Sequence, residues 1–293
     1  MRRLLPIFVS VALLFPLSAF SSILCIPSDL DEIVGDNMVV FHPNLADSIG
    51  AVAGALNVLL DCTTPTLVYC LESDIEFCYP AQYEQGPDIA SQEIVWILNN
   101  YYPAVPGMPS ELSTDVQRSA AVQLAIWHFS DGIDITTGGS DPAVFAAANA
   151  IIAAALTATP PSTPTSLVLT PAYSTPVMPG TEVTVTATVY DQNGVAMPGV
   201  PISYTITHVG SGSGVTDSNG QFPVTWTESE IGYDVITFTV DYTIPIGLRW
   251  VFPGCQDLVQ ATTEDGRITA VWGENQPVST ESSSWGGIKS LYR

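Results

Sequence analysis

A glutamine on the apolar side of a helix is the feature that most constrains this chain. Residues 113–132, STDVQRSAAVQLAIWHFSDG, predict a helix, because Thr114 and Gln117 have the spacing of an N-terminal capping box. At about 100° per residue, the apolar stripe of this helix consists of Val116, Ala120, Leu124 and Trp127. Gln123 lies inside that stripe. A carboxamide buried without partners costs about 1–3 kcal/mol, so Gln123 is expected to be fully hydrogen-bonded or to take part in chemistry.

Residues 1–21 are interpreted as a secretion signal. A basic start precedes an apolar run, and Ala19 and Ser21 are small residues where a signal peptidase cleaves. An uncleaved membrane anchor is the alternative, but Pro6 and Pro16 interrupt a run that is short for a bilayer span. We therefore expect an extracellular protein, secreted or attached to a cell surface.

The strongly negative net charge disfavours negatively charged binding partners. The chain has 7 Lys and Arg against 29 Asp and Glu, and removal of Arg2 and Arg3 with the signal changes the net charge from −22 to −24. Such a chain is repelled by phosphate backbones and anionic lipid, so neither nucleic acid nor direct membrane binding is expected. A basic target would be attracted. Lys289 is the only lysine, which suits a protein that carries an amine-reactive group.

The cysteines number five, which is odd for a secreted chain. Two disulfides would leave one thiol over, and that thiol needs an explanation. The gaps between Cys62, Cys70 and Cys78 lack the short spacing of a zinc knuckle, and no histidine pair accompanies them. No metal and no cofactor is therefore expected.

Residues 22–157 mix strand and helix patterns, which predicts an α+β domain with a β-sheet core and inserted helices. The expected strands are Met38–Phe41 and Thr66–Leu71, the second of which carries Cys70. Two more helices are expected at Ser91–Tyr101 and Pro142–Leu156, the latter capped by Asp141. Residues 45–60 have small and aliphatic side chains that suit a packed segment, with the composition of a helix.

The second half changes period after a Pro/Thr linker at residues 158–165. Alternating segments between turn residues predict an all-β antiparallel sandwich over residues 166–273. The expected strands are Glu182–Tyr190, Pro201–Thr207, Pro223–Thr227, Asp234–Thr243 and Gly266–Trp272. Residues 245–265, with Cys255, are expected to form a long loop. Residues 274–293 are expected to be a polar tail, whose end, Trp285–Arg293, is either a sorting signal or an unstructured terminus.

Three segments of the first half together resemble the bacterial surface thioester domain, whose helix signature is T-Q-x-A-I/V-W. The helix segment here is Val122–Trp127, VQLAIW, with Val122 where the family usually has Thr. The second segment is Val68–Glu72, VYCLE, similar to the family's aromatic-Cys-aliphatic-acid strand. The third, Ile97–Pro103, resembles the segment that precedes the glutamine helix.

This resemblance implies an internal thioester between the Cys70 sulfur and the Gln123 side-chain carbonyl. A thiolate is a strong nucleophile, and an amide side chain offers an acyl carbon whose leaving group is ammonia. The bond explains both the core-facing glutamine and the fifth thiol. It implies an adhesin that captures a target nucleophile, a lysine amine above all, in one covalent event without enzymatic turnover. With Cys70 used in this way, we expect a disulfide between Cys62 and Cys78, and then one between Cys25 and Cys255.

The second half resembles the immunoglobulin-like repeats of bacterial surface proteins, through segments such as Thr181–Gln192 and Pro198–Tyr204. Its expected role is to hold the first domain away from a surface.

Two other functions are compatible with these residues. The first is a non-covalent binding or structural module, in which Gln123 is a satisfied core amide and Cys70 a buried hydrophobe or half of a disulfide with Cys62 or Cys78. The second is a cysteine hydrolase that uses Cys70 and His128, assisted by Asp131 or Asn99. No glycine-rich nucleophile turn surrounds Cys70, which disfavours the hydrolase.

Overall fold

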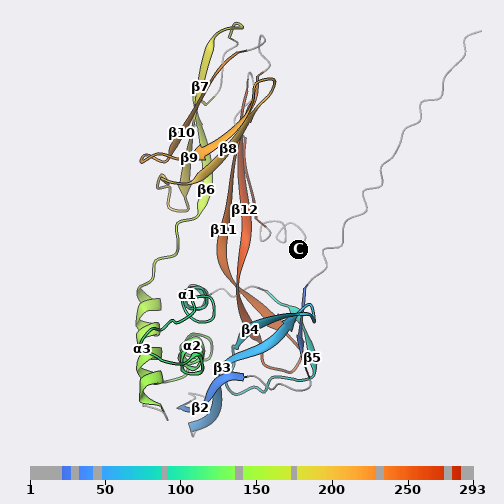
Figure 1. The fold of residues 1–293 in the computed structure, drawn as a ribbon, viewed down its shortest axis with the longest axis vertical. Coiled ribbons are helices and arrows are strands. Elements are labelled where there is room, and N and C mark those ends of the chain that lie inside the picture. The colour runs from blue at the N-terminus through green and yellow to red at the C-terminus, as the bar shows by residue number, and fades with distance from the viewer. Residues whose placement is uncertain are drawn as a thin grey trace, which may run out of the picture.

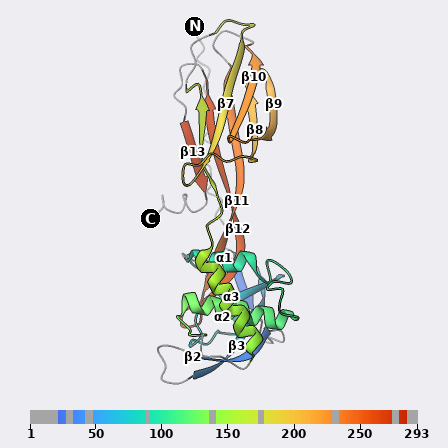
Figure 2. The same cartoon turned by 90° about the vertical axis from the view of Figure 1, so that its left-hand side faces the viewer.

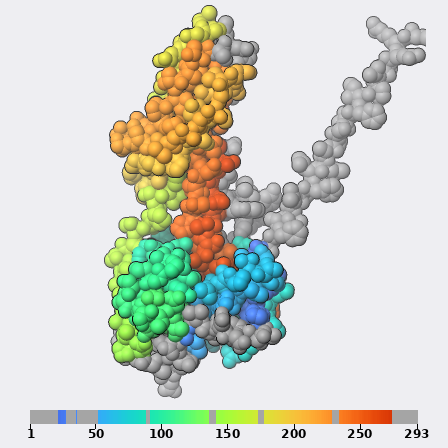
Figure 3. Space-filling model, in the orientation of Figure 1, coloured from blue at the N-terminus to red at the C-terminus, as the bar shows by residue number. Residues whose placement is uncertain are grey.

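The computed structural model describes residues 22–27, 33–41, 48–87, 91–135, 141–172, 177–228, 234–273 and 279–284. The expected secretion signal and the expected sorting signal at residues 285–293 lie outside these ranges. The described chain forms two parts placed end to end, and a long hairpin runs through both (Figure 1). In the space-filling view that hairpin and the segment after the last helix form a narrow waist between the parts (Figure 3).

The first part contains both helices and strands. Its strands are β1 (Ile23–Ile26), β2 (Ile33–Phe41), β3 (Ser48–Leu60), β4 (Thr64–Cys70) and β5 (Ala81–Gln85). Its helices are α1 (Gln92–Asn100), α2 (Asp115–Ser130) and α3 (Pro142–Thr157). All three expected helices are confirmed. They lie together on one side of the strands, with α3 outermost (Figures 1 and 2).

Residues 48–60 form a strand, so the helical interpretation of this segment is wrong. Its small side chains have another role: Ala53 and Ala55 are fully buried, and α2 packs against this strand with its own alanines. Small residues on both elements allow the close approach of helix and sheet. The small side chains of this segment therefore reflect its close packing against α2, and they do not indicate a helical conformation.

The second part consists of antiparallel strands. These are β6 (Pro164–Thr170), β7 (Glu182–Asp191), β8 (Pro201–Ile206), β9 (Gly210–Val215), β10 (Gln221–Thr227), β11 (Ile236–Val251), β12 (Leu258–Trp272) and β13 (Ser279–Ser284). One layer has the order β10-β7-β6, and the other runs β9-β8-β11-β12-β13. Buried side chains from both layers, among them Val185, Phe238 and Ala270, form one core. The layered antiparallel arrangement is as expected, whereas an immunoglobulin-like topology stays a prediction.

The hairpin of β11 and β12 completes a closed ring of strands in the first part. The order β12-β4-β3-β1-β5-β11 closes because β11 also pairs with β12, and every pairing is antiparallel. Residues opposite one another in the register share a face, which places one set of buried side chains inside the barrel: Leu24, Leu56, Val68, Tyr83, Trp250 and Leu258. The barrel is thus built from both halves of the chain.

Two sequence expectations are wrong at this hairpin. Residues 245–265 are not a long loop, and the boundaries 22–157 and 166–273 do not describe the packing, because Trp250, Leu258 and Val259 lie in the first core. Pro245 stands within β11, opposite Thr263. A proline is tolerated there because no third described strand pairs with that stretch of β11, so the missing N–H faces no acceptor.

The disulfides also differ from expectation. Cys25 pairs with Cys62 and Cys78 with Cys255, at Cα–Cα distances of 5.0 Å and 5.7 Å. The expected pairs, Cys62 with Cys78 and Cys25 with Cys255, are wrong. The first true pair follows from β1 lying beside β3, where Cys25 faces Leu59. The second follows from the hairpin tip reaching the segment after β4. Cys70 belongs to neither disulfide, as expected, and it is buried.

Candidate functional site

Helix α2 is the central element of the site. It begins after Thr114, whose hydroxyl accepts a hydrogen bond from the Gln117 N–H (3.2 Å), and it ends at Asp131. Every residue from Ser119 to Trp127 is buried, because strands lie on one side of the helix and other helices on the other. Val116 is the exception to the predicted stripe, with 40% of its surface exposed. Gln123 is fully buried, as predicted.

The carboxamide of Gln123 bonds both backbone groups of Cys70. Gln123 Oε1 accepts from the Cys70 N–H (2.9 Å), and Gln123 Nε2 donates to the Cys70 carbonyl (2.8 Å). The pairing of β3 with β4 ends at Leu56 and Val68, so this edge of β4 is open at Cys70. On the opposite edge it is Leu71, the next residue, that donates to Asp257 of the hairpin (2.9 Å). The glutamine side chain therefore takes the place of a neighbouring strand.

Two further contacts fix α2 to the chain that follows Cys70. The Ser130 hydroxyl donates to the Leu71 carbonyl (2.7 Å). The Ser73 N–H donates to the Asp131 carboxylate (2.8 Å), and the Ser73 hydroxyl donates to the same oxygen. Together with the Gln123 pair, these bonds hold the helix and the strand end in a fixed register over two turns of helix.

The thiol of Cys70 lies at one end of the barrel. Its cross-strand neighbour Leu258 is fully buried, and Cys70 itself is only 7% exposed. Burial, and secondly the nearby Glu72 carboxylate, raise the pKa of the Cys70 thiol far above its usual range. The sulfur is therefore protonated in this state. A thioester carries no charge, so the same burial would not penalise it.

Charged and hydroxyl groups gather beside Cys70. Glu72 Oε2 accepts from the Asp257 N–H (2.8 Å), and Arg249 forms an ion pair with the Asp257 side chain. Tyr83 accepts at its hydroxyl from the Cys78 N–H (3.1 Å). Desolvation raises the pKa of Glu72. Asp257 and Tyr83 were missed from the sequence, since they reach the site only through the barrel, whereas Glu72 stands in the Cys70 segment.

The residues of the alternative hydrolase do not assemble around Cys70. His128 Nδ1 lies 3.1 Å from the Ile133 carbonyl, and Asn99 donates to the Val95 carbonyl (2.8 Å). Asp131 bonds Ser73. Across the described ranges, none of these side chains is hydrogen-bonded to Cys70, and no cluster of three potential metal ligands occurs. Among the described residues, no helix has both the length and the hydropathy of a membrane span.

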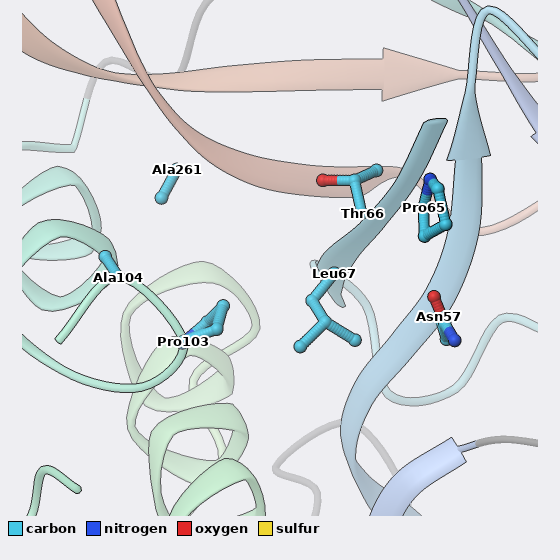
Figure 4. A pocket seen from close by; sticks show the side chains of 7 residues that line it. All are labelled: Asn57, Pro65, Thr66, Leu67, Pro103, Ala104 and Ala261. Carbon is cyan, nitrogen blue, oxygen red and sulfur yellow. The ribbon is translucent and has the colours of Figure 1, made fainter. Parts of the chain in front are cut away.

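A pocket of about 450 Å³ lies nearby, between β3, β4, β12 and the segment after α1 (Figure 4). Leu67 of β4 points into it, between Pro103 and Asn57. Successive side chains of a strand point to opposite faces, so Leu67 and Cys70 leave β4 on opposite sides.

Comparison with known proteins gives a consistent result. Residues 67–157 match the family model of the thioester domain. A search of curated proteins found no match. Among solved structures, the Bacillus anthracis TIE protein is similar with a TM-score of 0.54 and 13% identity, over 87% of this chain and 49% of that one. This chain thus spans about half of that structure.

The thioester domain of the Enterococcus faecium TIE86 protein is similar with a TM-score of 0.51 and 14% identity, over 90% of this chain and 96% of that one. At such identities the likeness concerns the fold. The family match covers both Cys70 and Gln123, which the structure brings together. Residues 67–157 thus match the thioester domain in sequence, and the chain resembles solved thioester-domain structures in fold.

Proposed function

We propose that Cys70 and Gln123 form an internal thioester with which this protein captures an amine covalently. The observation that carries the proposal is the buried pair of hydrogen bonds between the Gln123 carboxamide and the Cys70 backbone. In the reaction the Cys70 sulfur bonds to the Gln123 side-chain carbon, the carbon–nitrogen bond breaks, and the thiol proton leaves with the nitrogen as ammonia.

The two hydrogen bonds suit this chemistry. The Cys70 N–H points at Gln123 Oε1, the oxygen on which negative charge develops during attack, and so acts as a preorganised donor. The Cys70 carbonyl holds the leaving nitrogen through Nε2. Since the residue that provides the nucleophile also holds the carboxamide through its backbone, the two reacting residues are kept together before the reaction.

Burial protects the product. Gln123 has no exposed surface and Cys70 has 7%, so bulk water has little access to the acyl carbon. A neutral amine is a stronger nucleophile toward an acyl carbon than water, so an amine that reaches the bond would react with it in preference. Attack by that amine forms an amide with Gln123 and returns the proton to the Cys70 sulfur.

The biological role that we propose is covalent adhesion by a secreted or surface-attached protein, with a lysine amine as the preferred target. The net charge of −22 supports a basic target, because it steers positively charged partners toward the protein. The second part, about as long as the first and joined through a narrow waist, would hold the reactive part away from an attachment point (Figures 1 and 3).

A fluorescent primary amine tests the capture step. The wild-type protein should retain the label after denaturation, whereas Cys70→Ala and Gln123→Ala should not, although both should show the wild-type circular dichroism. Equal labelling of Cys70→Ala would contradict the proposal. Labelling absent from the wild type, with binding of partners unchanged in Cys70→Ala, would favour the non-covalent module instead.

A further inference from the structure

Glu72 is held in a fixed position relative to Cys70. Leu71, which separates them, donates its N–H to Asp257 (2.9 Å) and accepts the Ser130 hydroxyl at its carbonyl (2.7 Å). The first of these bonds continues the ladder between β4 and the hairpin beyond Cys70. Both residues contact the same stretch of the hairpin, because Cys70 is paired with Leu258 and Glu72 accepts the N–H of Asp257, the residue before Leu258.

In the described part of the chain, the Glu72 carboxylate is held by a hydrogen bond to only one of its two oxygens. Oε2 accepts the Asp257 N–H (2.8 Å), while Oε1 has no hydrogen-bond partner among the described residues. The side chain is half-buried, so one oxygen remains available to a group that enters beside Cys70.

The groups that face Glu72 come from every element around it. Asp257 and Arg249 belong to the hairpin, Asp131 to the end of α2, Tyr83 to β5 and Cys70 to β4. Desolvation is the main cause of the raised pKa of Glu72, which makes its carboxylate a stronger base than an exposed glutamate.

The capture reaction needs such a base. An arriving lysine is attracted here as an ammonium, yet only a neutral amine attacks an acyl carbon, and the nitrogen must lose a proton as the amide forms. The Cys70 thiolate is a poor leaving group here, because burial raises the pKa of the Cys70 thiol. One group that accepts the first proton and donates it to the sulfur meets both requirements.

We propose that Glu72 is the proton-transfer group of the capture reaction, accepting a proton from the attacking amine and delivering it to the Cys70 sulfur. This inference rests on the proposed function. In the step the amine nitrogen bonds to the Gln123 acyl carbon, the carbon–sulfur bond breaks, and Glu72 returns to its carboxylate form. The products are an amide on Gln123 and the Cys70 thiol.

The variant Glu72→Gln tests this role, because its amide oxygen can still accept the Asp257 N–H. The reaction of methylamine with protein that already carries the thioester should be followed by intact mass. Its second-order rate constant should be calculated from the concentration of neutral methylamine. We expect a loss of about 10²-fold, whereas Glu76→Gln, an exposed carboxylate of the same segment, should react like the wild type. Formate should restore part of the rate to Glu72→Ala.

The pH dependence of the aminolysis rate constant distinguishes proton transfer by Glu72 from a purely structural role, which would not produce it. In the wild type the rate constant per free amine should fall as the pH drops through the raised pKa of Glu72, because its carboxylate becomes protonated. In Glu72→Gln the same constant should not change with pH over this range. If Glu72→Gln forms no thioester, a flat wild-type profile still overturns the proposal.

The two proposals fail in different ways. A Glu72→Gln protein that has lost one ammonia from its mass and reacts at the wild-type rate overturns the role of Glu72 alone. A wild-type protein with no ammonia lost overturns the thioester itself.

Discussion

Cys70 lies directly opposite Leu258. Leu258 belongs to β12, which continues without interruption from the barrel into the second part of the molecule. The strand that carries the proposed nucleophile is thus paired with the hairpin that holds the two parts together. Glu72 and Leu71 are bonded to the same hairpin at Asp257. Any movement of the hairpin tip therefore changes the surroundings of the thiol.

The disulfide between Cys78 and Cys255 should be the clamp that prevents this movement. We expect Cys78→Ser/Cys255→Ser to lower the free energy of unfolding by about 2–5 kcal/mol and to speed hydrolysis of the thioester, because water gains access between β4 and β12. Thermal unfolding and the rate of gain of one water in the intact mass check the two effects.

The matched control is Cys25→Ser/Cys62→Ser, which removes the other disulfide. Its sequence separation is 37 against 177, so loop entropy predicts a loss that is smaller by about 1.5RT ln(177/37), roughly 1.4 kcal/mol. It should leave hydrolysis unchanged, since it lies away from the β4–β12 pair. Equal hydrolysis rates in both double variants would contradict the clamp.

Asp131 should be needed to keep α2 in register with the strand end. Asp131→Ala removes the acceptor of both the Ser73 N–H and its hydroxyl, which should cost about 1–3 kcal/mol. Formation of the thioester should also slow, because Gln123 is held less firmly against Cys70. Ser73→Ala, which keeps the backbone bond, should show a smaller loss of both. An Asp131→Ala protein as stable and as fast as the wild type would refute this register contact.

The thiol released by amine capture should be unreactive in the folded protein. Its pKa is raised by burial and by Glu72, so it stays protonated at neutral pH and iodoacetamide should modify it far more slowly than after denaturation. The folded state disfavours the thiolate, so stability present below the ordinary thiol pKa of about 8.5 should be lost as the pH rises toward the raised value.

The thioester form has no Cys70 thiol to ionise and serves as the control. Its free energy of unfolding should not show the alkaline loss that the aminolysed form shows. Rapid alkylation of the folded aminolysed protein, at the rate of an exposed cysteine, would show that the thiol is not held as described.

Helix α2 and the burial of Gln123 could be predicted from local sequence. The capping pair Thr114 and Gln117 and the apolar stripe lie within one helix, and short-range rules govern both. The placement of Gln123 against Cys70 could not be derived from those rules, because it depends on β4 losing its neighbour β3 after Val68. Only the resemblance to a family brought the two residues together in advance.

The barrel and the disulfides could not be predicted, for a related reason. Residues 245–265 carry Pro245 and Pro253, which indicate a loop, yet the first stands where a two-stranded ribbon tolerates it. Trp250 pairs with Gln85 of β5, and Leu258 pairs with Cys70 of β4. Both pairs join segments that are distant in the chain, which no local pattern reveals. Cys255 reaches Cys78 only once that hairpin is in place, so spacing alone favoured other partners.

The decisive test of the thioester is the intact mass of the purified protein, taken without a thiol reductant that would itself attack a thioester. We expect a mass one ammonia below that of the chain with its two disulfides, an increase by one methylamine on incubation with that amine, and neither change in Gln123→Ala. A wild-type mass equal to that of the disulfide-bonded chain, unaltered by methylamine, would show that no thioester forms.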